Sequence, residues 1–382
     1  MKLVLAALIC LTITCSFSQG AGLSFGKHTE VKATSQQGLD EKFIADLSAV
    51  EIVEKQGSKF FILACDEGCS IKIASSINGK LATDTVENIN VLSEFFSTSG
   101  YEGVHEIEEL DFEAMAVKGD FLAVAASASL KRKKPKGKSI KKDKKKLNTL
   151  SRACKQPIIK GEETLYPSDL LFVFKIGEIR DNSLELSPHK VFDVRSSLAK
   201  PAANGANPLT KNGNHFFNLP SKDNGLDIEG LTIINDEFLL GLRGPVLRGH
   251  ALVVAFPFTA EVAERSLKVG MFASQPQFRF INLEGFGIRS LETVEDSVYI
   301  IAGPTMAITR THFSVYKWDG KTDIFKQRRV IYSATEYEHC LDITPNNYEL
   351  KPESLAYDST EKKLHLYCDG DSIFCSYELP LE

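Results

Sequence analysis

Residues 227–242 read Asp-Ile-Glu-Gly-Leu-Thr-Ile-Ile-Asn-Asp-Glu-Phe-Leu-Leu-Gly-Leu, and this stretch decides the fold. Two short apolar segments flank an Asn-Asp pair, which is the pattern of two β-strands joined by a tight turn. The same plan recurs along the chain. The stretch therefore predicts a β-hairpin that is one copy of a repeat.

Five copies share a polar or acidic residue, an apolar strand, a turn and a second apolar strand. They begin at positions 46, 111, 227, 287 and 351, so the spacings are 65, 116, 60 and 64 residues. Such spacings are typical of propeller blades that carry loop insertions. Further short strands rich in β-branched and aromatic residues fill the intervals. We expect an all-β protein, a β-propeller of five four-stranded blades, or of six if the long interval holds a degenerate copy.

The N-terminus has the composition of a secretory signal peptide. Lys2 precedes an apolar stretch over residues 3–14, and small residues follow it. This stretch is too short to span a bilayer, and no later segment has eighteen consecutive apolar residues. We therefore expect residues 1–18 to be a signal peptide and 19–382 to form one secreted, extracellular propeller domain without a transmembrane segment. A segment near Leu23 to Val31 is expected to close the ring by pairing with the last blade.

Six cysteines follow the signal peptide, and an even number in an oxidising compartment favours disulfides. They are Cys65, Cys69, Cys154, Cys340, Cys368 and Cys375. The two local pairings would be Cys65 with Cys69 and Cys368 with Cys375, which leaves Cys154 with Cys340. The spacings do not match the paired C-x-x-C arrangement of structural zinc sites. We expect structural disulfides.

Two segments interrupt the repeat and are expected to be insertions into a blade, at residues 128–155 and 199–220. The first contains the basic run Lys131–Lys146, with eleven basic residues and one acidic residue, although the whole chain has a formal net charge of −5. Such a run attracts polyanions, such as a sulfated glycan or a phosphorylated ligand. It lacks the aromatic residues that stack on bases, so nucleic acid is not expected. The alternative is a solvated loop without a dedicated partner.

Three copies of the repeat carry a glutamate near the start of the first strand: Glu113, Glu229 and Glu353. First strands line the axis of a propeller, so these carboxylates are expected to converge there. Clustered carboxylates repel one another and need a cation, a proton or an arginine. One interpretation is a metal site, with calcium as the candidate ion. The other is an internal Arg–Glu network that holds the blades together.

Arg243, Arg248 and Arg289 are the candidate partners of these glutamates. In an antiparallel hairpin that turns near Asn235, Glu229 and Arg243 lie opposite each other at the same end. Their charge pair is expected to lower the pKa of Glu229. The Gly244-Pro245 dipeptide is expected to form a tight turn that presents Arg248 to the same mouth. Among the histidines, only His250 is a candidate general base.

The string Gly-Leu-Asp-Ile-Glu-Gly-Leu at 225–231, followed by Leu-Gly-Leu-Arg-Gly-Pro-Val-Leu-Arg-Gly at 240–249, resembles the hallmark of domain-of-unknown-function family 3616. This is a mainly bacterial family of propeller-like proteins. The resemblance continues in the second and fifth copies of the repeat and covers most of the chain. Ala114 and Ser354 depart from it, because the family pattern has Gly there. The resemblance implies a β-propeller and supplies no reaction.

Two classes of function remain open. The first is an extracellular binding or scaffold protein for an anionic ligand. The second is a metal-assisted hydrolase, such as an esterase, lactonase or phosphatase-like enzyme, with its site at the propeller axis. The sequence has no G-x-S-x-G elbow, P-loop or dinucleotide motif, which argues against serine-hydrolase and nucleotide-binding functions.

Overall fold

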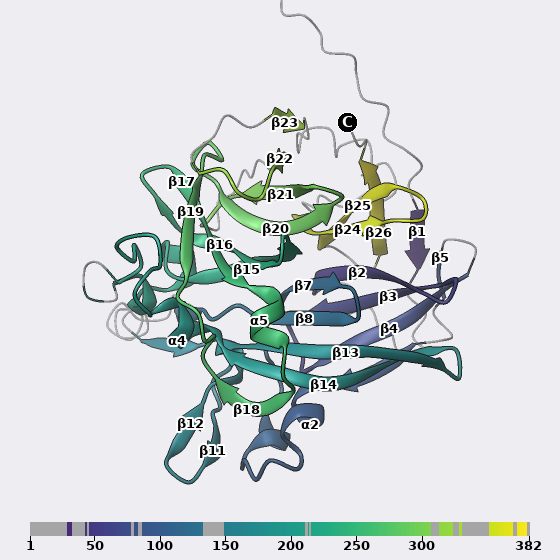
Figure 1. Cartoon of the computed structure of the whole chain (residues 1–382), viewed down its shortest axis with the longest axis horizontal. Coiled ribbons are helices and arrows are strands. Elements are labelled where there is room, and N and C mark those ends of the chain that lie inside the picture. The colour runs from purple at the N-terminus through teal and green to yellow at the C-terminus, as the bar shows by residue number, and fades with distance from the viewer. Residues whose placement is uncertain are drawn as a thin grey trace, which may run out of the picture.

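The computed structural model describes residues 29–32, 43, 46–77, 80–82, 86–132, 149–210, 213, 215–306, 313–323, 328–330, 351–369 and 373–379. The expected signal peptide, Cys340 and most of the basic run lie outside these residues. The described part consists mainly of strands (Figure 1). Its α-helices are short: α2 (Val91–Phe96), α4 (Val194–Leu198) and α5 (Phe258–Val262). No helix in these ranges is long and apolar enough to cross a membrane.

Within the described residues the strands form five sheets of four or five strands. The first sheet contains β2 (Leu47–Lys55), β3 (Ser58–Cys65), β4 (Ser70–Ile77), β5 (Lys80–Leu81) and β6 (Glu87–Asn90). The second contains β7 (Phe112–Lys118), β8 (Phe121–Ala126), β13 (Leu170–Arg180), β14 (Ser183–Asp193) and β18 (Ser266–Gly270). The third contains β15 (Asp227–Ile234), β16 (Glu237–Leu247), β17 (His250–Pro257) and β19 (Gln277–Ile281).

The fourth sheet contains β20 (Gly287–Val294), β21 (Ser297–Gly303), β22 (Ser314–Trp318) and β23 (Arg328–Val330). The fifth contains β24 (Lys351–Asp358), β25 (Lys363–Asp369), β26 (Ile373–Leu379) and β1 (Thr29–Lys32). Two short ribbons accompany the sheets: β9 (Leu130–Arg132) with β10 (Leu150–Arg152), and β11 (Ile158–Lys160) with β12 (Glu163–Leu165).

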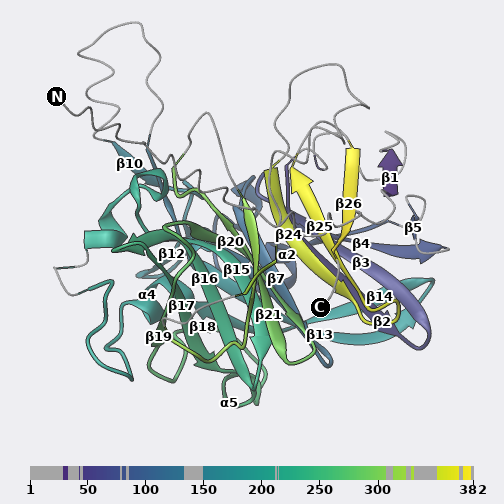
Figure 2. The same cartoon turned by 90° about the horizontal axis from the view of Figure 1, so that it is seen from above.

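The first strands of the five sheets meet at the centre of the molecule. Strand β2 contacts β7, β7 contacts β15, β15 contacts β20, β20 contacts β24, and β24 contacts β2 again. The sheets extend outward from these strands, as the two perpendicular views show (Figures 1 and 2). The fold is therefore all-β and propeller-like, as the repeat predicts.

The hairpin quoted at the outset forms as its sequence predicts. Strands β15 and β16 pair antiparallel, with Ile234 opposite Glu237. Between them Asn235 and Asp236 both have positive φ, at 52° and 62°. Asn and Asp tolerate this left-handed conformation better than most residues, and a two-residue hairpin loop needs it. All eight residues of β15 are buried, because neighbouring sheets cover both faces of this strand.

Two strands each join a sheet whose other strands are remote from them in the sequence. Strand β1 pairs antiparallel with β26, from Thr29 opposite Ser376 to Lys32 opposite Ile373, which confirms the expected N-terminal strand exchange. Strand β18 lies in the connection between β17 and β19 of the third sheet, and it pairs in parallel with β14 of the second sheet. Both contacts cover strand edges that would otherwise be open to pairing with other chains.

Buried aromatic residues fill the space between sheets. Phe272 stacks on Phe192 of the second sheet and on Phe256 of the third, with ring centroids 4.1 Å and 4.2 Å apart. The guanidinium of buried Arg195, in α4, donates to the carbonyl oxygens of Ala128 and Phe217. One side chain therefore links the start of the first insertion to the end of the second.

The disulfide predictions need correction. Cys65 and Cys69 are not joined to each other in the structure, so their predicted pairing is wrong, whereas Cys340 lies outside the described residues, so its pairing with Cys154 stays a prediction. Cys65 belongs to the core shared with the fifth sheet, whereas Cys69 belongs to the core shared with the second sheet. The two side chains thus enter different cores despite their short spacing. The side chain of Cys375 lies outside the described residues, so its pairing with Cys368 stays a prediction.

Candidate functional site

Every first strand carries a β-bulge at the same position of the repeat. In each central hairpin one residue of the first strand has no partner in the ladder, and the register shifts there. These residues are Ser48, Glu113, Glu229, Arg289 and Glu353. A bulge redirects a side chain out of the regular alternation of a strand. The repeat therefore presents one bulge residue from each sheet at the centre.

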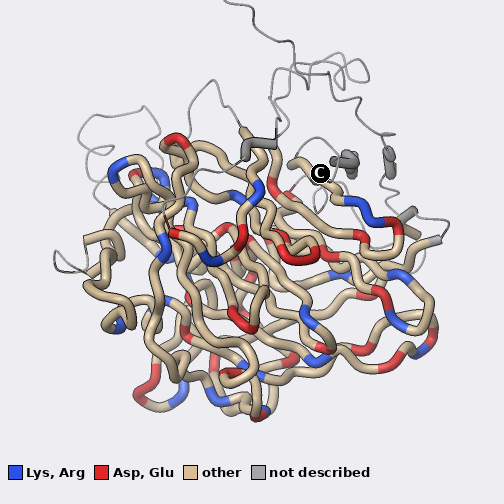
Figure 3. Tube along the Cα trace, turned by 45° about the horizontal axis from the view of Figure 1, so that its top comes forward, with Lys and Arg blue, Asp and Glu red and all other residues tan. Residues whose placement is uncertain are grey.

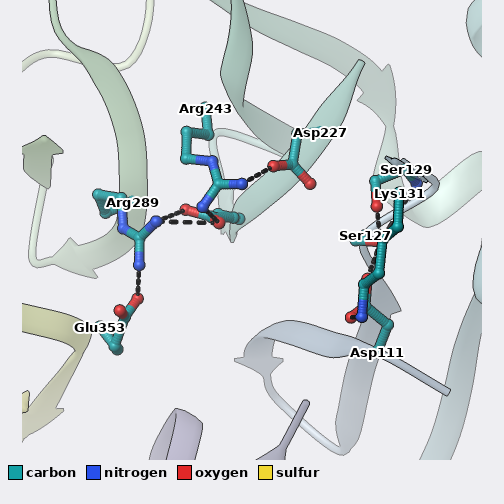
Figure 4. A network of polar contacts seen from close by, with 9 residues as sticks. Asp111, Ser127, Ser129, Lys131, Asp227, Arg243, Arg289 and Glu353 are labelled. Carbon is teal, nitrogen blue, oxygen red and sulfur yellow. Dashed lines mark hydrogen bonds and ion pairs between the residues drawn. The ribbon is translucent and has the colours of Figure 1, made fainter. Parts of the chain in front are cut away.

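Arginines bind two of these glutamates. Arg243 Nη1 lies 2.5 Å from Glu229 Oε1, and its Nη2 lies 2.5 Å from Asp227 Oδ2. Arg289 Nη1 lies 2.8 Å from Glu229 Oε2, and its Nη2 contacts Glu353. Figure 4 shows this chain of contacts, which runs through the third, fourth and fifth sheets. The structure thus brings together four of the six predicted residues as an Arg–Glu network.

Burial dominates the ionisation of this network. It raises the pKa of Glu229 to about 8 and that of Asp227 to about 6, although Arg243 opposes both shifts. The expected lowering of the Glu229 pKa is therefore wrong, because loss of hydration outweighs the charge pair. Arg289 has a raised pKa: burial lowers it, but Glu229 and Glu353 outweigh that effect.

Glu113 belongs to a different group of carboxylates. Asp66, Asp111 and Glu113 each contribute one carboxylate oxygen to a group in which all three oxygens lie within 4.8 Å of one another. Burial, followed by the charges of Asp111 and Glu229, raises the pKa of Glu113 well above its usual value. Asp66 Oδ1 is buried without a hydrogen-bond partner in the described structure, and burial raises the Asp66 pKa to about 7.

Lys131 is the cation closest to this carboxylate group. Its Nζ lies 2.8 Å from Asp111 Oδ1 and 2.8 Å from Glu109 Oε1. Asp111 also accepts a hydrogen bond from Ser127, whose hydroxyl is 2.9 Å from that of Ser129 (Figure 4). Lys131 is the first residue of the basic run. The run therefore begins beside the centre of the molecule.

We call the nine charged residues at the centre the axial group. They are Asp66, Asp111, Glu113, Lys131, Asp227, Glu229, Arg243, Arg289 and Glu353. After burial, the charges of Asp111, Glu229, Asp66 and Asp227 raise the pKa of Glu113. The carboxylates around Glu113 and the Arg–Glu network therefore interact electrostatically. Six carboxylates face three cations in this group. Charged segments of both signs gather near the middle of the trace (Figure 3).

Other predicted residues lie away from this group. Arg248 is exposed in the turn between β16 and β17, and it forms no ion pair with a described residue. His250 Nδ1 lies 3.1 Å from the carbonyl oxygen of Arg248, in the same turn. Gly244 and Pro245 lie within β16, so the expectation that they form the turn is wrong. The backbone of Gly244 packs closely on Gly225, so a side chain does not fit at this position: a Cβ at Gly244 would lie 2.3 Å from the Gly225 oxygen.

Sequence reasoning did not place Asp66, Asp111 or Lys131 at the centre of the molecule. One signal was available for Asp111, because it precedes the bulge residue by two positions, as Asp227 does in the third copy. In the fourth copy Gly287 takes this place. A Cβ there would lie 2.0 Å from the Arg243 carbonyl oxygen, so a larger residue does not fit.

The fold and the axial group define an all-β, propeller-like protein with a charged centre. The chain belongs to the family described as "Protein of unknown function (DUF3616)", whose model matches residues 46–169 and 191–371. This confirms the resemblance found in the sequence. A comparison with curated proteins found no match.

Solved structures with a similar fold include several enzymes. The glutaminyl cyclase of Myxococcus xanthus has a TM-score of 0.43 and 9% identity, covering 94% of this chain and 96% of that chain. A GH43_1 enzyme from Xanthomonas citri has a TM-score of 0.38 and 8% identity, covering 91% and 88%. The PQQ domain of pyranose dehydrogenase from Coprinopsis cinerea has a TM-score of 0.37 and 8% identity, covering 92% and 98%. Likenesses this distant carry no argument about function.

Proposed function

We propose that the chain is a secreted, five-bladed propeller that binds a divalent cation, with calcium as the first candidate, and through it an anionic ligand. The observation that carries the proposal is the approach of Asp66, Asp111 and Glu113 to within 4.8 Å. Calcium takes about six to eight oxygen ligands, and carboxylates are its usual protein ligands. Three carboxylates would leave positions for water and for an anionic group of the ligand.

The charge balance of the axial group supports a cation. Arg243 and Arg289 already contact Asp227, Glu229 and Glu353, so neither guanidinium is available to hold an anion by itself. In this proposal the metal ligands are Asp66, Asp111 and Glu113. They replace the set expected from the sequence, which was Glu113, Glu229 and Glu353. Glu113 is the member that both interpretations share.

The contacts of the central strands support the blade count of five in this proposal. The contacts of β2, β7, β15, β20 and β24 return to their starting strand, which supports one blade for each of the five sheets. The N-terminal composition supports secretion.

The basic run would attract the anionic ligand. Lys131 lies on Asp111, and Arg132 contacts Asp223, so these contacts anchor the start of the run beside the axial group. The partner class that fits such a run is a polyanion, such as a sulfated glycan or a phosphorylated ligand. A basic run that starts beside a carboxylate-bound cation would favour a ligand that is anionic at one end.

A metal-assisted hydrolase is the second candidate. The observation that favours it is the pKa of Asp66, which burial and Asp111 raise to about 7. In this candidate Asp111 and Glu113 would hold the cation, and Asp66, as a carboxyl group that exchanges its proton near neutral pH, would serve as the general acid or base. Hydrolysis of model esters, lactones or phosphate esters by the cation-loaded protein distinguishes this enzyme from a binding protein.

Thermal unfolding in calcium, magnesium or manganese, compared with chelator, tests the cation site. A ligand that binds only the folded state stabilises it by about 2.7 kcal/mol at one hundred times its Kd. We expect a rise in Tm for the wild type and none for Asp66→Asn or Glu113→Gln. The matched control is Glu264→Gln, because Glu264 is exposed and outside the axial group. The proposal fails if no cation raises the Tm, or if Asp66→Asn and Glu113→Gln respond like the wild type.

A further inference from the structure

We infer that Cys69 and Cys154 form a disulfide in the oxidised protein, which ties the first sheet to the insertion at residues 128–155. The inference rests on the secretion included in the proposed function, because an oxidising compartment maintains such bonds. In the structure the two thiols are not bonded to each other. The pairing differs from each one expected from the spacing of the cysteines.

Both thiols lie around one small region. Cys69 directly precedes β4, and its Sγ donates to the Ile107 carbonyl oxygen at 3.1 Å. Cys154 follows β10, and its Sγ donates to the Gln156 carbonyl oxygen at 3.2 Å. Ile107, Cys154 and Gln156 line the same cavity of about 190 Å³. Cys69 therefore contacts a residue of the cavity wall to which Cys154 itself belongs.

The two cysteines also share a hydrophobic core. Both are buried, with 7% and 3% of their surface exposed, and both belong to the core between the first and second sheets. Burial raises the pKa of Cys69 to about 12, and the neighbouring Cys154 thiol is the next cause. Cys65 differs, because burial and the carboxylates Asp66 and Asp46 raise its pKa, and no cysteine contributes. Cys69 therefore has a second cysteine in its surroundings, and Cys65 does not.

Oxidation joins the two Sγ atoms and releases two protons and two electrons. The acceptor is a disulfide, either glutathione disulfide or that of a thiol–disulfide oxidoreductase, which is reduced to two thiols. Thiolates are the reactive species, and burial keeps both groups protonated in the folded chain. The bond is therefore expected to form during folding, before the first and second sheets close over the thiols.

The crosslink would fix one side of the axial group. Asp66 lies three residues before Cys69, and Glu109, which binds Lys131, lies in the same cavity wall as Cys154. The backbone already joins these segments, because the Leu110 amide donates to the Gly68 carbonyl oxygen at 2.9 Å. A covalent bond here would keep the carboxylate group and the base of the basic run in a fixed relation.

Peptide mapping tests the pairing directly. The purified full chain is refolded in a glutathione redox buffer, alkylated in denaturant and digested without reduction. We expect one crosslinked peptide containing Cys69 and Cys154, which disappears after reduction. Separately alkylated Cys69 and Cys154, or either one linked to another cysteine, would refute the inference. Because the buffer supplies the oxidant, this result does not depend on secretion, and the cation melts remain a separate test of the proposed function.

A second measurement uses stability. Reduction with dithiothreitol should lower the Tm of the oxidised wild type by several degrees, because the bond closes a long loop of the unfolded chain. The Cys154→Ala variant should show no such shift, whereas the Cys65→Ala control should show the full shift. An equal dithiothreitol response in Cys154→Ala would also refute the inference.

Discussion

Replacement of Arg243 by Leu tests whether the axial network holds the ring together. The substitution removes the cation from Asp227 and leaves Glu229 with Arg289 alone. Removing one partner of a buried ion pair typically destabilises a protein by about 3–5 kcal/mol, because the remaining charge stays buried. For a chain of this length, an entropy of unfolding near 2.1 cal/mol/K per residue converts this loss to about 4–7 °C in Tm.

Differential scanning calorimetry at pH 7 measures the effect. The matched control is Arg248→Leu in the adjoining turn, where the same exchange removes an exposed arginine without an ion pair to a described residue. We expect this control to melt within about 1 °C of the wild type. Adding Asp227→Asn to Arg243→Leu should recover part of the loss, because it removes the unpaired charge. Equal melting temperatures for Arg243→Leu and Arg248→Leu would refute the reasoning.

Three further predictions concern the ring. Burial raises the pKa values of Glu51 and Glu292, the latter to about 8, so the folded state binds these protons more tightly than the unfolded state. Stability should therefore fall as pH rises from about 4.5 towards 8. Melts of Glu51→Gln should lose the Glu51 share of this pH dependence, with a higher Tm than wild type at pH 8 and little change at pH 5, whereas Glu292 and the carboxyl groups of the axial group keep the rest. Gly287→Ala should lower the Tm by several degrees, because its Cβ would collide with a backbone carbonyl. The control Gly270→Ala should not lower the Tm, because the space around Gly270 is open. Similar melts for both variants would contradict the close approach at Gly287. Deletion of the strand Thr29–Lys32 should expose the edge of β26 and promote association, which light scattering detects. A monodisperse truncated protein would contradict the role of that strand.

The sequence predicts the hairpins well because each one is local. Strand, turn and strand lie within about twenty residues, so alternation and turn chemistry are enough to identify them. The contact of Glu229 with Arg243 was predicted from an unbroken register. In the structure both residues are extra residues on bulges, flanked by pairs such as Gly230 with Gly241. The sequence therefore predicted the contact correctly, but it did not predict the bulges that produce the contact.

The rest of the site depends on long-range packing. Asp66, Asp111 and Lys131 come from separate turns and strands, and only closure of the ring brings them together. The cysteine pairing was missed for a related reason. Which core a thiol enters depends on the face of the sheet it occupies, and the three residues between Cys65 and Cys69 carry the chain across to a different core.

The bulges have an evolutionary consequence. A side chain on a bulge has no cross-strand partner, so its replacement leaves the pairing of the hairpin unchanged. The centre of this ring currently holds Ser48, Glu113, Glu229, Arg289 and Glu353, one residue from each copy of the repeat. Descendants of the same chain could exchange these five residues while keeping the hairpins, provided that ion-paired members such as Glu229 and Arg289 change together. Chemistry at the axis and architecture around it can therefore change at different rates within one lineage.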